Sequence, residues 1–499
     1  MSQEKHLDYS TPPQDASNDA LPAAGTTMSA EDQAAVRRAV RKIDLAVVPV
    51  MTMYYFLSFL DRANIGNARI AGLQTDLGFS DHQYQIVVTV LFVPYIAAEL
   101  PSNLLLRYLG PQIVMPTLLS VWGIVVMIQG FITTYEGLIV ARAFLGALEG
   151  PMFPGIVLYL SGFYTRSELS VRIAMFFSAA SLSGAFSGLL AAGIQEMEGL
   201  GGRRGWQWIF IIEGLFSTVC GLIGYFVTPG TPRDIRLLSE KEKDLVMARL
   251  EADRPSINPS DSFSFKYVKQ SLTSIHVVLV FIMFFCVGTT LYGISLFLPS
   301  LVRDFGYSRN TTQLLSAGPY GAAFFVTLLS AYLSDKYKTR GIPAAILMLI
   351  AAIGYIMYLT QTDRNVLYGA FFLIVSGVFA SPPPIAAWMA NNSEPYFTRA
   401  TSVAMGFVAT NSGGILSTWL YPTNQGPRYT TTMRLNLAFC IIPLALAIVN
   451  ALILSRANKI KKQKRDQLLA PYSSSGQADG GLQAWMDLGD KHPDFKYAL

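Results

Sequence analysis

The sequence predicts an all-α membrane protein with twelve transmembrane helices, and three observations lead to that fold class. First, 52% of the 499 residues are apolar and only 14% are charged, whereas soluble domains carry about 25% charged residues. Second, the apolar residues form long blocks rather than the one-sided stripes of surface helices. Third, each block spans roughly 17 to 25 residues, which is the length that crosses the hydrocarbon core of a bilayer.

The apolar blocks fall into two groups of six, separated by a polar stretch. They begin near Ile43, Gln83, Ile113, Leu138, Val171 and Trp208, and then near Val277, Leu315, Ile342, Leu367, Thr401 and Leu435. We therefore expect a disordered cytosolic tail (1–35), a six-helix bundle (36–228), a cytosolic central loop (229–275), a second six-helix bundle (276–455) and a cytosolic tail (456–499). Within the loop, Ser239 and Glu242 fit a capping box that would start a surface helix.

The placement of Lys and Arg predicts that both termini lie in the cytosol. The N-terminal stretch lacks the apolar run of a cleaved signal peptide. The ends of the blocks that would face inward carry more Lys and Arg than the opposite ends, above all in the run from Arg456 to Arg465, and positive residues near helix ends favour the cytosolic side. The net charge of +5 thus reflects membrane orientation and does not indicate a nucleic-acid partner. Asn310 then begins a possible glycosylation sequon on the outer side.

Several other protein classes are excluded by residue content. A chain with 30 Phe and 24 Tyr is not disordered, and its three cysteines each lie inside an apolar block, which argues against a disulfide framework. The four histidines stand far apart, so we expect no metal site, and no phosphate-binding loop or cofactor motif occurs. A membrane-embedded enzyme would need a buried His or Cys with a base partner, which the sequence does not offer.

Ionisable residues inside the apolar blocks are the strongest functional signals, because each costs about 2.5 to 3.5 kcal/mol near a helix centre. They are Asp61, Arg62, Glu99, Arg142, Glu149 and Glu213. The Asp61–Arg62 pair either ends the first helix as an outer ion pair or lies within a helix that continues under protein cover. We favour continuation, because the following Asn64 and Asn67 would be unsatisfied against lipid and suit a cavity wall.

Arg142 and Glu149 stand seven residues apart, which places them on one helix face, about 10.5 Å apart along the axis. A guanidinium binds a carboxylate through two hydrogen bonds and stays charged, whereas a buried carboxyl group can exchange a proton. The pair therefore suits an anionic substrate that moves with a proton. The alternative is that Arg142 pairs with a carboxylate only to hold helices together.

Five motifs carry a resemblance that covers roughly residues 43–454. They are 59–68 (FLDRANIGNA), 99–103 (ELPSN), 142–155 (RAFLGALEGPMFPG), 205–214 (GWQWIFIIEG) and 333–336 (LSDK) with Arg340. With these motifs the chain resembles the major facilitator superfamily, and within it the anion:cation symporter family in its fungal allantoate and nicotinate permease branch.

That resemblance implies the major facilitator fold, in which helices 1, 4, 7 and 10 of two related bundles line a central cavity. It implies that Arg62 and Arg142 hold the carboxylate of the substrate, while Glu149 and Asp61 carry protons. Further lining residues would be Asn64, Tyr292, Trp388 and Asn411, although core packing is the alternative role of the two aromatic residues. Gating would rely on the loop of the second half, with Asp335, Lys336 and Arg340. The equivalent loop of the first half lacks the Asp of the superfamily's loop signature.

Taken with the residues, the resemblance implies proton-coupled uptake of a small organic anion by alternating access, in a monomer of the plasma membrane. The substrate would be a vitamin-like or nitrogen-rich carboxylate such as nicotinate or allantoate. Glu149 is the first choice for the coupling group, because Arg62 should hold its neighbour Asp61 ionised. An efflux carrier for a secondary metabolite is the nearest alternative, and a substrate sensor that does not transport is another.

Overall fold

The computed structural model describes residues 29–253, 265–337, 339–394, 396–475 and 481–499. Within these ranges the chain forms helices and loops, and no strand occurs in them. The expected disordered tail (1–35) falls mainly on residues 1–28, which lie outside the described part. The first helix already begins at Ala30, where the side chain of Ser29 accepts a 3.1 Å hydrogen bond from the backbone N–H of Asp32, a standard helix N-cap.

The helices divide into two halves with a connecting segment and a C-terminal tail. The first half contains α1 (Ala30–Ile70), α2 (Leu73–Asp76), α3 (Asp81–Leu109), α4 (Pro111–Gln129), α5 (Tyr135–Glu149), α6 (Met152–Ser161), α7 (Arg166–Gln195) and α8 (Gly205–Val227), and the connecting segment contains α9 (Glu240–Asp253) and α10 (Phe265–Thr273). The second half contains α11 (Ile275–Arg303), α12 (Arg309–Lys336), α13 (Gly341–Thr360), α14 (Arg364–Ala380), α15 (Pro382–Asn391), α16 (Tyr396–Trp419) and α17 (Thr430–Gln463), and the tail contains α18 (Arg465–Leu469) and α19 (Gly481–Leu488). Short 3-10 turns occupy Leu200–Gly202, Pro232–Asp234, Thr423–Gln425, Ala470–Ser475 and Gly489–Lys491.

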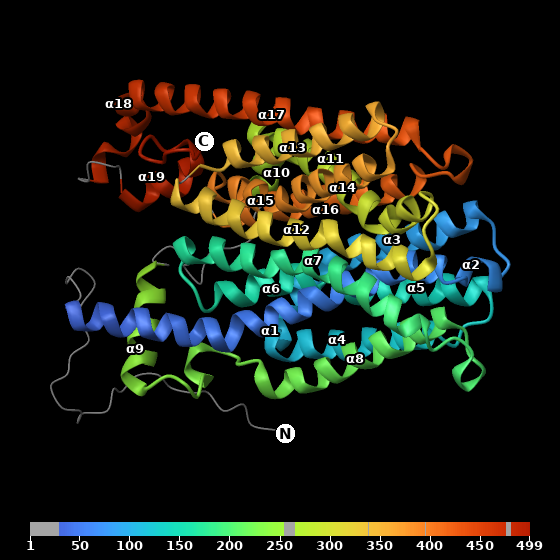
Figure 1. Ribbon diagram of the computed structural model, residues 1–499. Coiled ribbons are helices and arrows are strands. Elements are labelled where there is room, and N and C mark those ends of the chain that lie inside the picture. Colours follow the sequence, from blue (N-terminus) through green and yellow to red (C-terminus); the bar gives the residue numbers. More distant parts are fainter. Residues whose placement is uncertain (1–28, 254–264, 338, 395, 476–480) are drawn as a thin grey trace.

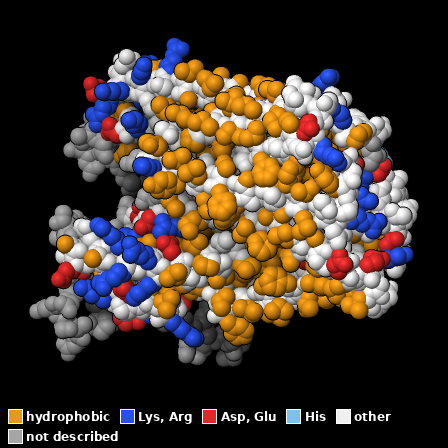
Figure 2. All heavy atoms as spheres, viewed as in Figure 1, with side chains coloured by type: hydrophobic (Ala, Val, Ile, Leu, Met, Phe, Trp, Pro, Cys, Tyr) orange, Lys and Arg blue, Asp and Glu red, His pale blue; other side chains and the backbone are white. Residues whose placement is uncertain are grey.

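Ten helical spans of the described chain are long and apolar enough to cross a membrane. Two of these spans are helix pairs, α5 with α6 and α14 with α15. The helices α3 and α16, of 29 and 24 residues, run alongside them, so the arrangement is consistent with the twelve predicted helices. Figure 2 shows apolar side chains in a broad band around the middle, with charged side chains gathered at both ends, as expected for a surface in contact with lipid tails.

The two halves pack side by side along their lengths (Figure 1). The contacts between them join α7 to α12, α3 to α16 and α1 to α11. The start of α1, the helix α9 and the tail helices α18 and α19 lie at one end of the molecule, which we call the tail end, and α2 lies at the opposite, far end. In Figure 2 the surface is hollowed between the halves at the tail end.

The connecting segment lies against the first half at the tail end. The predicted capping box is confirmed, because the backbone N–H of Ser239 donates to the Glu242 carboxylate at 2.9 Å and the N–H of Glu242 donates to the Ser239 hydroxyl at 3.4 Å. The same carboxylate forms an ion pair with the ammonium of Lys42 of α1, with an N–O distance of 2.8 Å. The helix α9 is thereby held beside the start of α1.

The helix α1 does not end at the Asp61–Arg62 pair. It continues to Ile70, and both charged side chains are buried, with 1% and 6% of their surface exposed. The prediction that the helix continues under protein cover is therefore confirmed. A helix of 41 residues is about 60 Å long, so α1 also extends beyond the apolar band at the tail end.

Candidate functional site

The buried guanidinium of Arg62 is the centre of a polar cluster between the two halves. Its Nε donates to Glu149 Oε2 at 2.7 Å, and its Nη1 donates to the hydroxyl of Tyr292 at 3.0 Å. The Tyr292 hydroxyl in turn donates to Asn411 Oδ1 at 3.0 Å. The ring of Tyr95 lies beneath the guanidinium, 4.4 Å from its carbon. Because Arg62, Tyr95 and Glu149 belong to the first half and Tyr292 and Asn411 to the second, the cluster joins the halves.

Close helix packing places Glu149 within reach of Arg62. A Cβ on Gly150 would come within 2.5 Å of the backbone oxygen of Tyr95, and a Cβ on Gly146 would meet that of Leu91. Only glycine allows α5 to approach α3 this closely. The end of α5 that carries Glu149 is therefore drawn against α3 and toward α1.

The guanidinium of Arg142 lies deeper in α5 and has a different environment. It is 1% exposed, and its Nε and Nη2 have no hydrogen-bond partner among the residues that the structure describes. Its carbon lies 5.9 Å from the centre of the Phe210 ring. A buried guanidinium without acceptors is costly. The two nitrogens together carry three N–H groups that could donate to an acceptor in the site.

Asp61 does not pair with Arg62, although the two are neighbours in sequence. Its Oδ2 accepts hydrogen bonds from the indole of Trp122 at 3.0 Å and from the Ser217 hydroxyl at 3.1 Å. The expectation that Arg62 holds Asp61 is therefore wrong in its geometry, because successive residues of a helix point about 100° apart. Asn64 is also fully buried and lies beside Glu213 inside the first half.

A small cavity of about 10 Å³ lies between the two arginines, which is room for about one water molecule. Its walls include Arg62, Arg142 and Tyr292, with Phe92 and Ser295. The structure therefore brings the two predicted anion-binding residues to one space. In this conformation the cavity has no room for a molecule much larger than water.

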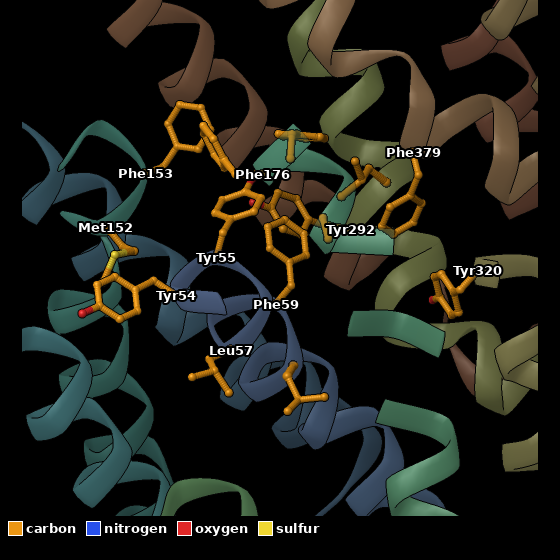
Figure 3. Close-up of a cluster of buried hydrophobic side chains, with 14 of the residues drawn as sticks. Tyr54, Tyr55, Leu57, Phe59, Met152, Phe153, Phe176, Tyr292, Tyr320 and Phe379 are labelled. Carbon is orange, nitrogen blue, oxygen red and sulfur yellow. The ribbon is translucent and has the colours of Figure 1, made fainter. Parts of the chain in front are cut away.

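Aromatic contacts between the halves enclose this cavity toward both ends of the molecule. Toward the tail end, the rings of Phe153 and Phe407 lie 3.9 Å apart, and Figure 3 shows Phe153 and Tyr55 in the same cluster of buried rings. Toward the far end, the ring centres of Tyr84 and Phe297 are 6.5 Å apart, and the hydroxyl oxygens of Thr89 and Thr418 are 2.7 Å apart. These layers keep the cavity from opening to either side in this conformation.

The structure does not bring Trp388 to this cluster. Its fully buried indole lies toward the tail end on α15, where its Nε1 donates to the backbone oxygen of Ala498 at 2.9 Å. The predicted gating residues also lie at the tail end of the second half: Arg340 Nη1 donates to Ser334 Oγ at 2.9 Å, and Lys336 is exposed beside tyrosine rings. The backbone of Asp335 belongs to the last turn of α12, and its side chain lies outside the described part.

Two members of the cluster had little or no sequence signal as site residues. Glu99 is one of the ionisable residues inside the apolar blocks, but no sequence pattern indicates its partner Asn411, with which it interacts across the halves. Tyr95 was not singled out, because one tyrosine among 24 carries no pattern. Its position four residues before Glu99, on the same face of α3, was the available signal.

Two helical halves with a small cavity at their boundary, lined by apolar residues and two arginines, are typical of transporters of the alternating-access class. The sequence matches the profile described as Major Facilitator Superfamily over residues 51–418. The chain therefore belongs to the major facilitator superfamily, and its relatives and structural neighbours are transporters rather than enzymes.

Fungal relatives match the chain over most of its length. An uncharacterized transporter of Schizosaccharomyces pombe is 35% identical over 85% of this chain and 84% of its own. The high-affinity nicotinic acid transporter of Saccharomyces cerevisiae is 29% identical over 92% of this chain and 84% of its own. Among solved structures, a bacterial homolog of the human lysosomal transporter Spinster, in an inward-facing and occupied conformation, has a TM-score of 0.62 at 15% identity and covers 81% of this chain and 96% of its own. This last likeness shows the shared fold.

Proposed function

We propose that the protein is a proton-coupled carrier of a small organic anion. The observation that supports this most directly is the pair of buried guanidiniums, Arg62 and Arg142, on one cavity between the halves. Only Arg62 is matched by a carboxylate in a direct ion pair. The unmatched N–H groups of Arg142 suit an anion from outside the chain.

Competition for Arg62 provides the coupling in this proposal. Ionised Glu149 occupies the guanidinium of Arg62 at 2.7 Å. Once Glu149 takes up a proton, it loses its charge and the attraction weakens, so the carboxylate of the substrate binds Arg62 and Arg142 in its place. When the proton leaves, Glu149 returns to Arg62 and displaces the substrate. Asp61 is the second choice for the proton site, and it lies on the other side of α1 against Trp122.

The contact of Arg62 with Tyr292 and Asn411 would link this exchange to movement of the halves. A substrate carboxylate that draws Arg62 away from the Tyr292 hydroxyl weakens the bridge between the halves. Alternating access follows if the bridge re-forms after the substrate leaves. Neither Asn64 nor Trp388 enters this scheme, because both lie away from the cavity.

The substrate class we propose is a vitamin-like or nitrogen-rich carboxylate, with nicotinate first. The support is a relative described as a nicotinic acid transporter, together with a site whose aromatic walls, Phe59 and Phe92, suit a flat ring. We further propose membership of the anion:cation symporter family, a plasma-membrane location, cytosolic termini and a monomeric carrier.

Uptake of labelled nicotinate, allantoate, pantothenate and an aromatic acid, at acidic and at neutral external pH, tests this function. Arg62→Lys and Arg142→Lys keep the charge and lose the planar fork. We expect both to reach the surface and to lose about 10- to 100-fold in apparent affinity. Arg309→Lys, at an exposed arginine outside the cluster, is the matched control. Wild-type affinity in both test variants, or outward transport of the same compounds, would contradict the proposal.

A further inference from the structure

The last residues of the chain are held by the second half through their backbone. The side-chain amide of Asn392 accepts from the N–H of Ala498 at 2.8 Å and donates to the oxygen of the same residue at 3.0 Å. The side-chain amide of Asn458 likewise accepts from the N–H of Tyr497 at 2.9 Å and donates to the backbone oxygen of Tyr497 at 3.0 Å. Asn392, which directly follows α15, and Asn458 of α17 therefore each bind both backbone groups of one residue, as in the main-chain hydrogen bonding of bound extended peptides.

Leu499 lies at the start of α13. Its backbone oxygen accepts from the backbone N–H of Arg340 at 2.8 Å and from that of Gly341 at 3.4 Å. The first N–H groups of a helix have no partner within the helix, and here Leu499 supplies one.

Side chains of the tail add further contacts upstream of the terminus. The ammonium of Lys461 donates to the backbone oxygens of Asp490 and Phe495 and lies 3.8 Å from the centre of the Tyr497 ring. Arg465 pairs with the Asp494 carboxylate at 3.0 Å. Both the backbone and the side chains of this segment are therefore bound to the second half.

The site is built from segments that include the predicted gating loop. Trp388, which donates to Ala498, packs on Gly341 so closely that a Cβ there would lie 2.8 Å from the ring. The helix α15 that carries Trp388 starts after the break at Pro382 and contacts both α12 and, across the boundary between the halves, α7. The bound tail therefore connects α15, the α12–α13 loop and α17.

We propose that the tail end of the second half is a peptide-binding site, occupied by residues 490–499 of this same chain, and that this occupation locks α15 against the start of α13. The site is independent of the anion cavity and of the proposed substrate. Its ligand is a short extended peptide. Release of the tail would free α15 to move at the boundary between the halves.

Hydrogen exchange of the purified full-length chain tests the lock without any substrate. In Asn392→Ala, which removes two hydrogen bonds to Ala498, we expect the amides of residues 490–499, 340 and 341 to exchange about tenfold faster or more. Asn391→Ala is the matched control, because it is the adjacent asparagine and is exposed. Unprotected amides at 490–499 in the wild-type chain, or equal effects of the two substitutions, would overturn the proposal.

Binding of the segment is tested with a chain that is shortened to end at Gly489. A synthetic peptide of residues 490–499 should bind this chain, raise its Tm and restore slow exchange at Gly341. A peptide of the same composition in scrambled order should bind at least tenfold more weakly, and neither should bind the full-length chain. Equal binding of the two peptides would overturn the proposed site. If the shortened chain does not fold, the hydrogen exchange of Asn392→Ala still tests the lock.

Discussion

The hydroxyl of Tyr292 is the most informative atom to remove, because it links the two halves at the anion site. It accepts a hydrogen bond from the Arg62 guanidinium and donates one to Asn411, each at 3.0 Å. Tyr292→Phe deletes this one oxygen and keeps the ring that packs edge-on against Phe92 at 5.0 Å. The substitution therefore breaks the polar bridge with little change in shape.

The expected magnitude follows from the two bonds. A hydrogen bond to a charged group contributes about 1.5–3 kcal/mol and a neutral one about 0.5–1.5 kcal/mol. Only one of the two, the bond to Arg62, crosses from one half to the other. If that bond is absent in open conformations, its loss shifts the balance toward them by about 1.5–3 kcal/mol, or roughly 10- to 150-fold.

A second cleft lies at the far end of the molecule, between Arg69 and Thr75 of the first half and Ser300 and Arg309 of the second. Spin labels across this cleft measure the balance between conformations without substrate. We would place them at Thr75 and Arg309, which line that cleft from opposite halves, after replacement of the half-exposed Cys220 by Ser. In Tyr292→Phe, the pulsed dipolar measurement should show a larger share of molecules in which the distance between the two labels is longer or shorter than the main wild-type distance. The label sites lie outside the cluster around Arg62.

Tyr320→Phe is the control for this experiment. The Tyr320 hydroxyl donates to the backbone oxygen of Ile294 at 3.3 Å, so its bond stays within the second half. We expect the wild-type distance distribution in this variant. An unchanged distribution in Tyr292→Phe, or the same change in both variants, would refute the view that the Tyr292 bridge holds the halves together.

Three further predictions concern coupling, orientation and pH. Glu149→Gln, which mimics the protonated acid, should still exchange substrate across the membrane but should not accumulate it when the outside is acidified. A tag after Leu499 should be protected in sealed cells, while a tag beside Asn310 should be reachable. The hydrogen bond from Lys42 lowers the pKa of Glu242 below its ordinary value of 4.5, so the contact between α9 and α1 should persist from neutral pH down to about that value. It should loosen only as the pH falls further, through the lowered pKa, because protonation removes the charge; protease cleavage within α9 would report this.

Each of these predictions has an outcome that contradicts it. If Glu149→Gln still concentrates substrate in response to a proton gradient, the coupling role passes to Asp61 or to another residue. An accessible C-terminal tag in intact cells would reverse the orientation. Two results would show that the pair with Lys42 does not hold α9. One is that cleavage of wild-type α9 already becomes faster near neutral pH, and the other is that cleavage in Glu242→Gln increases with acid as it does in the wild type.

Local patterns were enough to predict the helical membrane fold and several of its details. Block length and apolar content predict spans because the bilayer accepts only backbones whose hydrogen bonds are satisfied internally. The cap at Ser239 and the continuation of α1 past Arg62 also depend on residues a few positions apart. The same periodicity placed Arg142 and Glu149 on one face of their helix.

The partners of those residues were decided only by the tertiary structure. Glu149 pairs with Arg62, which lies 87 positions away in sequence, and Asp61 turns toward Trp122. Periodicity tells which face of a helix a side chain occupies, but the rotation and approach of the neighbouring helix determine what that face meets. Trp388 and the carboxyl terminus show the same limit, since their contact joins residues 110 positions apart. Such contacts arise because buried donors and acceptors must find partners once the helices have packed.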